Sequence, residues 1–273
     1  MKQLQDRRAL VTGGGRGIGR DIALTLAAAG ADVALLARTR QEVERVAAEV
    51  AAAGTRSLAL TADLADRQAV EAAVESIDDA WGGVDILVNN AGVLGPVGPS
   101  HEVDPDAWFE AIRINLGGCF LCSRAVLPGM IGRRDGRIIN LSGGGAVSPR
   151  PWFSAYGASK AAIVRFTETL AAEVADHGVQ VNAISPGAVN THMTREAVAA
   201  GERGGDEAAE GARQLAAGGT SAQPAADLVL YLASSRSVGL TGRLLAARWD
   251  DWESIDVELV MKAEAYTVRR IKP

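Results

Sequence analysis

Lysine and tyrosine are scarce in this chain of 273 residues, although basic residues as a class are not. The sequence has 24 Arg but four Lys, at positions 2, 160, 262 and 272, and three Tyr, at positions 156, 231 and 266. Aromatic residues make up 4% of the chain. Lys160 therefore stands out, because a chain that uses Arg almost everywhere keeps one interior Lys, four positions after Tyr156.

Cysteine is rarer still, and two cysteines exclude a disulfide framework. Cys119 and Cys122 have the spacing C-x-x-C, but they lie within a helical pattern without a second pair or a nearby His. Packing is therefore favoured over a redox or zinc role. His101, His177 and His192 are scattered along the chain, and the sequence predicts no metal site.

The chain also lacks basic blocks and long apolar runs. Its net charge is −5, which argues against binding nucleic acid through phosphate neutralisation. No stretch approaches the roughly 18 uninterrupted apolar residues that a membrane helix needs, so no membrane partner is expected. Residues 1–8 are polar and charged, which is unlike a secretory leader, and we expect a cytoplasmic protein.

What the sequence does have is an alternation of strands and helices. Strands are expected at 8–12, 32–37, 57–61, 85–89, 136–141, 179–185 and 243–248. Helices are expected at 17–30, 39–53, 67–81, 107–132 (broken or kinked), 154–177 and 224–234. This order predicts an α/β fold, in which a single Rossmann-type domain, 1–273, has a doubly wound parallel sheet with helices on both faces.

Two segments depart from the alternation. Residues 190–223 are rich in Ala, Gly and Glu and lack large apolar anchors, which is typical of a mobile loop or a weakly packed helix. The segment 249–273 extends the chain beyond the last predicted strand. Its Trp249 and Trp252 are equally compatible with a subunit contact or pocket edge and with packing of the tail on the core.

A glycine-rich turn joins the first predicted strand to the first helix, at residues 12–19, TGGGRGIG. Glycine lets the backbone turn sharply and approach a pyrophosphate, while the helix N-terminus presents free N–H groups to it. The spacing G-x-x-x-G-x-G differs from G-x-G-x-x-G and lacks the Lys-Ser/Thr ending of an ATP-binding loop. A dinucleotide site is favoured over a glycine turn without ligand.

The end of the second strand indicates which dinucleotide binds. An acid usually holds the adenosine ribose at this place, but here the sequence has Ala37 and Arg38, with Arg16 in the glycine turn. Two guanidinium groups without a carboxylate suit a 2′-phosphate, so NADP(H) is preferred and NAD(H) remains possible. The alternative is that both Arg side chains are solvated surface groups.

Tyr156 and Lys160 occupy positions i and i+4 at the start of a predicted helix, so both side chains lie on one face. A Tyr becomes an efficient general acid near neutral pH when a neighbouring cation lowers its pKa from about 10. Ser142 follows a strand in a Gly-rich turn, where its hydroxyl could polarise a carbonyl. Four further residues are candidates for a substrate pocket: Gly144, Trp152, Phe153 and His192. The polar, turn-forming neighbours of the two aromatic residues favour the pocket wall over a deep core position.

Taken together, these motifs resemble the short-chain dehydrogenase/reductase family over about residues 5–245, and in particular its 3-oxoacyl-carrier-protein-reductase-like ketoreductases. The matching motifs, in family order, are TGGGRGIG, Asp63, NNAG at 89–92, Asn115, Ser142, YGASK at 156–160, and Pro186-Gly187. The tail departs from the pattern, because many members end soon after the last strand.

The resemblance implies a role for each matching residue. Tyr156 would exchange a proton with the substrate, Lys160 would bind the nicotinamide ribose and depress the pKa of Tyr156, and Ser142 would orient the substrate oxygen. Asn115 would hold a water in the proton relay. The implied cofactor-binding residues are Gly13, Gly15, Arg16, Gly17, Ile18, Gly19, Arg38, Asp63, Leu64, Asn90, Ala91, Gly92, Tyr156, Lys160, Pro186, Gly187, Val189 and Thr191.

The predicted function is the NADPH-dependent reduction of a ketone or 3-oxo group to a secondary alcohol, with the hydride supplied by the cofactor. The alternatives are oxidation of a secondary alcohol by the same residues in reverse, or an idle nucleotide-binding scaffold. The family also implies that residues 190–223 cover the substrate. It further implies a homotetramer or homodimer formed through the long helices at 115–132 and 154–177.

Overall fold

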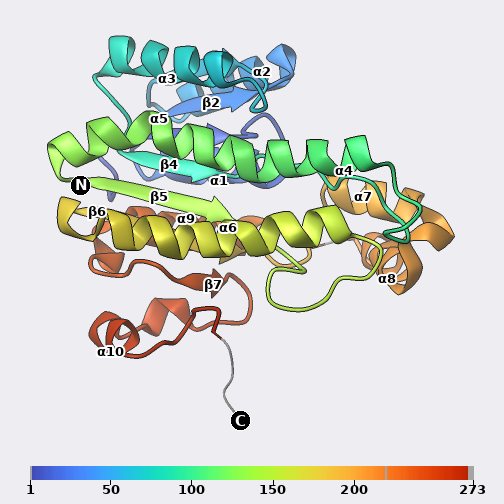
Figure 1. Cartoon of the computed structure of the whole chain (residues 1–273). Coiled ribbons are helices and arrows are strands. Elements are labelled where there is room, and N and C mark those ends of the chain that lie inside the picture. The colour runs from blue at the N-terminus through green and yellow to red at the C-terminus, as the bar shows by residue number, and fades with distance from the viewer. Residues whose placement is uncertain (1, 219, 270–273) are drawn as a thin grey trace.

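The computed structural model describes residues 2–218 and 220–269, and within these residues a parallel sheet of seven strands forms the centre of the molecule (Figure 1). The strand order is β3-β2-β1-β4-β5-β6-β7. The strands are β1 (Arg8–Thr12), β2 (Asp32–Ala37), β3 (Ser57–Thr61), β4 (Ile86–Asn89), β5 (Gly136–Leu141), β6 (Val179–Ser185) and β7 (Leu244–Ala246). The order reverses between β1 and β4, which confirms the doubly wound fold and predicts a ligand crevice at the carboxyl ends of these strands.

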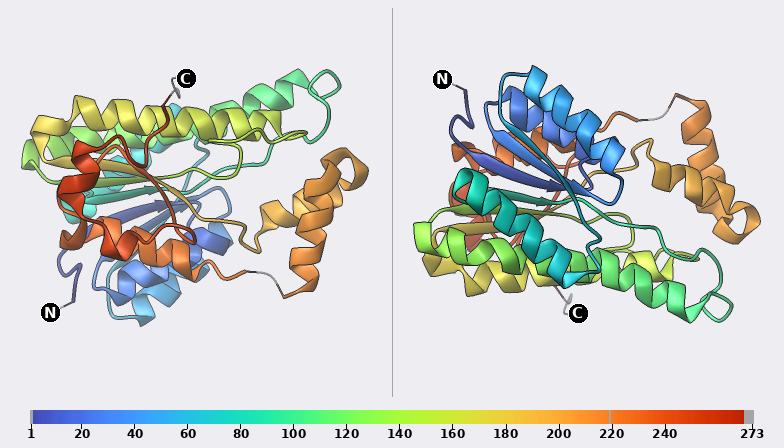
Figure 2. Two further views of the ribbon diagram at one scale, coloured as in Figure 1. Left: turned by 90° about the horizontal axis from the view of Figure 1, so that it is seen from below. Right: turned by 90° about the horizontal axis from the view of Figure 1, so that it is seen from above.

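Helices cover both faces of the sheet (Figure 2). They are α1 (Gly17–Ala28), α2 (Arg40–Ala52), α3 (Arg67–Trp81), α4 (Pro105–Ile112), α5 (Gly118–Arg133), α6 (Ser154–Glu173), α7 (His192–Ala199), α8 (Gly205–Ala216), α9 (Gln223–Ala233) and α10 (Val257–Lys262). Local sequence sets their limits. The Asp66 carboxylate caps α3 by accepting from the N–H groups of Gln68 and Ala69, and Gly82 ends this helix with φ +79°.

The sheet separates two apolar clusters. Ala9 and Val11 of β1 face the cluster that α1, α2 and α9 complete, whereas Leu10 between them faces the cluster under α3, α5 and α6. This alternation follows from the strand period of two residues. Because both faces are buried, the strands read as continuous apolar runs in the sequence.

The expected break in the helix at 107–132 is a π-helical turn, Arg113–Gly117, which joins α4 to α5. The joined segment Pro105–Arg133 is long and apolar enough, by length and composition, to cross a membrane. A helix that covers the core of a soluble protein passes the same test. Here Cys122, Val126 and Met130 are buried in the cluster that α3 and α6 share.

The segment 190–223 contains helices instead of a plain loop. Thr191 stands at the N-terminus of α7, a 3-10 turn Gly201–Gly204 follows, and α8 packs back on α7. These helices stand beyond the carboxyl ends of the strands, apart from the sheet (Figure 2, orange). Gly219 and residues 270–273 lie outside the described residues, and the mobility of the segment stays a prediction.

The tail after β7 returns to the core. Trp252 is buried against Tyr231 of α9, with ring centroids 5.4 Å apart, and its indole N–H donates to the carbonyl of Ala247. Trp249, in contrast, is 70% exposed. Packing on the core, one of the two roles predicted for these tryptophans, is therefore confirmed for Trp252 but not for Trp249.

Candidate active site

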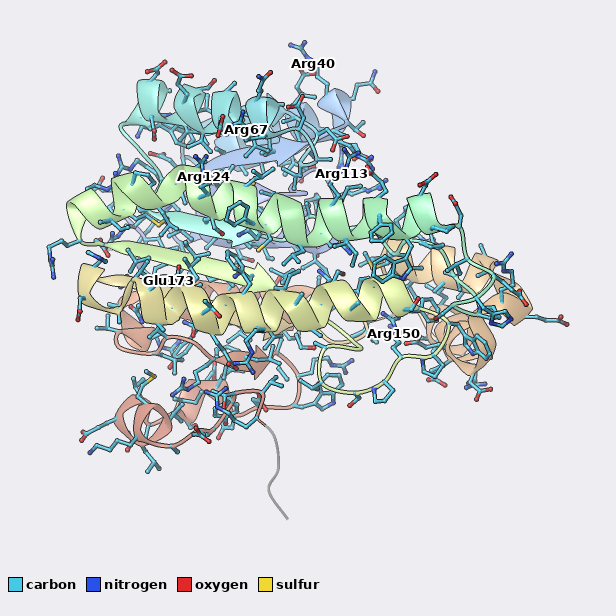
Figure 3. All side chains as sticks on the ribbon, viewed as in Figure 1. Arg40, Arg67, Arg113, Arg124, Arg150 and Glu173 are labelled. Atoms are coloured by element: carbon cyan, nitrogen blue, oxygen red, sulfur yellow. The ribbon has the colours of Figure 1, made fainter. Side chains whose placement is uncertain are left out.

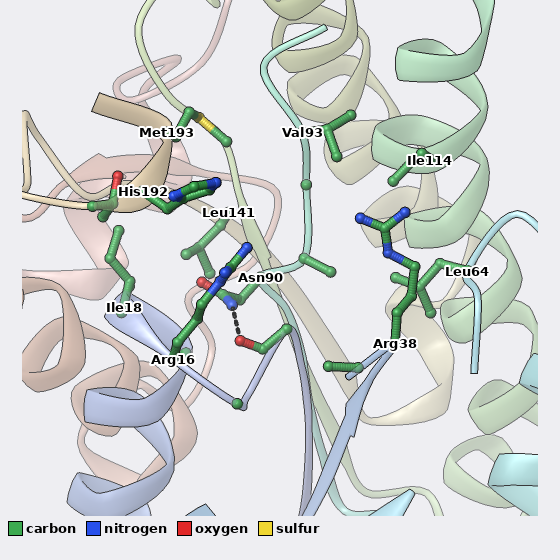
Figure 4. A pocket seen from close by; sticks show the side chains of 18 of the residues that line it. Arg16, Ile18, Arg38, Leu64, Asn90, Val93, Ile114, Leu141, His192 and Met193 are labelled. Carbon is green, nitrogen blue, oxygen red and sulfur yellow. Dashed lines mark hydrogen bonds between the residues drawn. The ribbon is translucent and has the colours of Figure 1, made fainter. Parts of the chain in front are cut away.

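A cavity of about 500 Å³ opens at the carboxyl ends of the central strands, where the strand order reverses (Figure 4). Most of the predicted site residues line it: Gly13, Gly15, Arg16, Gly17, Ile18, Gly19, Arg38, Asp63, Leu64, Asn90, Ala91, Gly92, Ser142, Tyr156, Lys160, Pro186, Thr191 and His192. The sequence did not indicate several others, among them Glu42, Ile114, Asn190 and Met193. Ordinary apolar or loop positions such as these have no motif signal.

Asn90 holds the glycine turn in place. Its side-chain amide donates to the carbonyls of Thr12 and Gly13, at 2.8 and 3.2 Å. A Cβ at Gly13 or Gly19 would approach this amide within 2.8 or 2.5 Å, so neither position accepts a side chain without a shift. Thr12 also links the glycine turn to the loop after β4, because its hydroxyl accepts from the backbone N–H groups of Asn90 and Ala91.

The N-terminus of α1 faces the same cavity. Its N-cap residue, Arg16, makes no side-chain capping hydrogen bond, and Gly17, Ile18 and Gly19 of its first turn line the cavity. Gly17 has φ +54°, a conformation that favours glycine. An uncapped helix N-terminus in a glycine cradle is suited to an anion, and these residues therefore fit the pyrophosphate of a dinucleotide.

The two predicted arginines lie at the cavity on different elements, as Figure 4 shows. Arg16 lies 3.4 Å from Glu42 of α2, and both side chains line the cavity. Arg38, just after β2, forms no salt bridge with any residue in the described ranges 2–218 and 220–269. Arg38 is therefore the freer of the two cations for a ligand phosphate.

Ser142 and Lys160 are held together by hydrogen bonds between α6 and the end of β5. Lys160 Nζ donates to the carbonyl of Leu141 at 2.8 Å, and Ser142 Oγ donates to the carbonyl of Lys160 at 3.2 Å. Both side chains are buried. Burial lowers the pKa of Lys160 to about 8, because an ammonium loses hydration inside the protein.

Tyr156 lies in the first turns of α6, and its hydroxyl lies against Gly143 of the turn after β5. A Cβ at Gly143 would come within 2.6 Å of that hydroxyl. The Tyr156 side chain is buried and joins a small apolar cluster with Leu94, Phe153 and Ala197 of α7. The phenol is thus fixed between the β5 turn and the 190–223 segment.

The expectation that a neighbouring lysine lowers the pKa of Tyr156 needs correction. Burial raises the pKa of this phenol above its ordinary value. The positive charge of Arg150 opposes the rise, and the carboxylate of Glu207 adds to it. Lys160 Nζ is 5.5 Å from the centroid of the Tyr156 ring. Without a bound cofactor, Arg150 is therefore the cation that favours the phenolate.

Asn115 lies at the π-helical turn, and its amide is fully engaged by protein groups. Its Nδ2 donates to the carbonyl of Val93 and to the hydroxyl of Ser159, and its Oδ1 accepts from the N–H of Val93. The side chain therefore ties the loop after β4, at Val93, to α6. Both N–H donors of the amide are thus used to position the backbone at Val93, and the water that the resemblance implied stays a prediction.

The prediction that Phe153 forms a pocket wall was wrong. Its ring is fully buried and packs in the small cluster with Tyr156, because Leu94 and Ala197, which are distant in the sequence, meet it there. Trp152 is 42% exposed, adopts φ +72° and lies against Gly205 of α8, outside the cavity lining. Gly144 is likewise outside the lining and adjoins Arg150.

His192, a candidate pocket residue, lines the cavity, and its Nε2 lies 3.3 Å from Oε1 of Glu196 on the same helix. Gly187 and Val189 do not line it. Gly187 packs against Arg248 of the tail, and the carbonyl of Val189 accepts from the hydroxyl of Thr194. Cys119 and Cys122 are free and buried, and burial raises the pKa of both thiols, so neither ionises readily.

Comparisons of sequence agree with this geometry. The family model described as short chain dehydrogenase matches residues 7–202. The chain is 34% identical over 246 residues to 2,3-dihydro-2,3-dihydroxybenzoate dehydrogenase of Bacillus subtilis, which covers 88% of this chain and 94% of that one. It is also 40% identical over 193 residues to a short chain dehydrogenase of Pseudocercospora fijiensis, over 70% of this chain and 62% of the relative.

Solved structures give the same result. NAD⁺-bound xylitol dehydrogenase superposes with a TM-score of 0.83 at 31% identity, over 90% of this chain and 98% of its own. A second structure is described as an NAD(P)-dependent gluconate 5-dehydrogenase from Beutenbergia cavernae with NADP bound at low occupancy. It superposes with a TM-score of 0.80 at 36% identity, over 90% of this chain and 96% of its own. With its glycine cradle and the buried Ser142, Tyr156 and Lys160 at one cavity, the chain belongs to the short-chain dehydrogenase/reductase family of NAD(P)-dependent oxidoreductases.

Proposed function

We propose that this protein reduces a ketone or 3-oxo group to a secondary alcohol with NADPH, and that Tyr156 donates the proton. The observation that carries the proposal is that Ser142, Tyr156 and Lys160 line one cavity with the glycine turn. A nucleotide-binding scaffold has no need of a buried phenol, hydroxyl and ammonium at the nicotinamide end of its site. NADPH, when bound, supplies the hydride.

Each of the three side chains has a distinct task in this proposal. The Ser142 hydroxyl holds the carbonyl oxygen by a hydrogen bond, and the Tyr156 hydroxyl gives that oxygen its proton as the alcohol forms. Lys160 binds the ribose next to the nicotinamide and keeps a positive charge near the phenol. Asn115 holds the backbone at Val93 in register with α6.

Burial favours the neutral form of the Tyr156 phenol over the phenolate. A phenol that is protonated at neutral pH is in the state that a proton donor requires. Oxidation of an alcohol by the same residue requires the phenolate, which forms at higher pH.

The preference for NADPH rests on Arg38 and Arg16. Arg38 lines the cavity at the end of β2, where an acid would hold a free ribose hydroxyl, and a guanidinium suits a 2′-phosphate. Arg16 pairs with Glu42 of α2, so in this proposal Arg38 is the main residue that selects NADPH over NADH.

The quaternary structure in this proposal is a homodimer or homotetramer formed through α5 and α6. Phe120 of α5 is 48% exposed and stacks edge-on against Phe166 of α6, with centroids 6.1 Å apart. An aromatic pair on the outer face of the two long helices suits a contact with a second copy of the chain.

The test is a screen of carbonyl compounds for oxidation of NADPH, followed at 340 nm. It includes 3-oxoesters, cyclic diketones and keto acids, with each active compound repeated with NADH. Turnover by the parent chain and none by Tyr156→Phe supports the proposal. Oxidation of NADPH at equal rates by both proteins would refute the assigned proton donor.

A further inference from the structure

Arg150 lies over the ring of the proposed proton donor. The carbon of its guanidinium is 4.8 Å from the centroid of Tyr156 and 4.6 Å from that of Phe153. The loop after β5 leaves room for it, because a Cβ at Gly145 would lie 3.1 Å from the Cβ of Arg150. Its side chain is 19% exposed, so this positive charge is poorly solvated.

Glu207 of α8 holds the guanidinium there. Arg150 Nε donates to both carboxylate oxygens of Glu207, at 2.6 and 2.7 Å. This pair joins the loop before α6 to the 190–223 segment, and Figure 3 shows Arg150 next to the start of α6 and to α8. Trp152 makes a second junction between the same two elements by packing on Gly205.

We propose that Arg150 is a positioning residue for the acid group of Tyr156, and that Glu207 fixes it in place, so that the seating of α8 sets the charge beside the proton donor. The inference deepens the proposed function, because it rests on Tyr156 as the donor. Arg150 touches the ring of Tyr156 and acts on the proton through its charge.

The other charged groups near Tyr156 come from three elements. Lys160 lies on its own helix, Glu207 comes from α8, and His192 and Glu196 of α7 line the same cavity and pair with each other. Loss of Arg150 leaves Lys160 as the remaining cation close to the ring. Loss of Glu207 has two possible effects of opposite sign, which makes it the informative change.

The direction in which the pKa of Tyr156 changes shows whether Glu207 positions Arg150 or acts only through its own negative charge. If Glu207 acts only as a negative charge, its removal lowers the pKa of Tyr156. If it holds Arg150 over the ring, its removal releases the guanidinium to solvent and raises that pKa. The proposal requires the rise. Glu207→Gln retains an acceptor for Arg150 Nε and should therefore not show it.

The test is a titration of Tyr156 by tyrosinate absorbance at 295 nm. Each variant is made with and without Tyr156→Phe, so that the difference between the two curves isolates this phenol from Tyr231 and Tyr266. We expect Arg150→Met and Glu207→Ala each to raise the pKa of Tyr156 by about 1 unit. Glu210→Ala is the matched control, because Glu210 is also on α8 but pairs with the exposed Arg213.

Far-UV circular dichroism at each pH establishes that the variants remain folded, and Arg150→Lys, which retains the charge, substitutes for Arg150→Met if that variant unfolds. With Arg150→Lys, which keeps a cation near the ring, we expect a rise smaller than that of Glu207→Ala. An unchanged titration in Arg150→Met, or an unchanged or lower pKa in Glu207→Ala, would overturn the inference. The titration needs no substrate, so it stands even if no carbonyl compound is turned over, which would count against the proposed function alone.

Discussion

The hydroxyl of Tyr156 lies against the backbone of Gly143, and a methyl group at Gly143 would come within 2.6 Å of it. This contact fixes the height of the phenol above the turn after β5. It also makes a glycine outside the cofactor-binding turn essential to the geometry of the site. No motif in the sequence distinguishes Gly143 from its two glycine neighbours.

Gly143→Ala should therefore displace the Tyr156 hydroxyl and lower kcat by about 10²-fold, the usual effect of a misplacement near 1 Å. NADPH binding, followed by fluorescence, should change little. Gly144→Ala is the matched control, because its Cβ would meet Arg150 at an ordinary 3.8 Å. Equal loss of activity in both variants would contradict the proposed contact.

Tyr156→Phe removes the proton donor and keeps the ring in its apolar cluster. We expect kcat to fall by about 10²- to 10⁴-fold, the contribution of a general acid. The thermal midpoint and the Kd for NADPH should stay close to those of the parent. Near-normal turnover would show that another group supplies the proton.

Arg38→Asp should shift the cofactor preference from NADPH toward NADH. A charge-assisted hydrogen bond of about 1.5–3 kcal/mol corresponds to a change of roughly 10- to 100-fold in the ratio of kcat/KM values. Arg40→Asp is the control, since Arg40 pairs with Glu44 on the exposed side of α2. An unaltered ratio in Arg38→Asp would remove the basis for NADPH preference.

Lys160 should make stability depend on pH in an unusual direction. Burial lowers its pKa from 10.5 to about 8, so between these values the unfolded chain binds the extra proton and stability rises with pH. Below pH 8 the buried ammonium opposes folding by on the order of 3 kcal/mol. Lys160→Met should thus be more stable than the parent at pH 7, by urea denaturation.

This advantage of Lys160→Met should shrink between pH 8 and pH 10, as the ammonium of the parent loses its proton. The measurement uses the protein without cofactor, because a bound ribose would compensate the charge. A constant difference across this range would mean that the pKa of Lys160 is the same in the folded and the unfolded chain, so that burial does not lower it.

Phe120→Glu should weaken association between subunits, because a carboxylate in an apolar contact loses its hydration. Light scattering over a concentration series measures the mass. Val238→Glu is the control, because Val238 is also exposed, at 59%, but lies in the turn after α9. An identical mass for Phe120→Glu and the parent would place the interface elsewhere.

The fold was largely predictable because the buried parallel strands of the sheet are apolar on both faces. The strands at 8–12, 136–141 and 179–185 agree with β1, β5 and β6 to the residue. Local spacing also brought Tyr156 and Lys160 together, since they share one helix. The motifs around Asn90 and Ser142 fall at strand ends, which a parallel sheet brings to one edge.

The remaining features depend on contacts between distant segments. Phe153 is buried because Leu94 and Ala197 meet it, and neither contact is encoded near residue 153. Arg150 looked like one of many surface arginines until α8 placed Glu207 beside it. The pKa of Tyr156 was misjudged for the same reason, because burial is a property of the assembled fold.

The apolar cluster around Tyr156 shares no residue with the two clusters that flank the sheet among the described residues. The apolar contacts that stabilise the sheet are therefore separate from those that hold α7 against Tyr156. Substitutions of Ala197 should therefore disturb the seating of Tyr156 and leave the apolar contacts of the sheet unchanged.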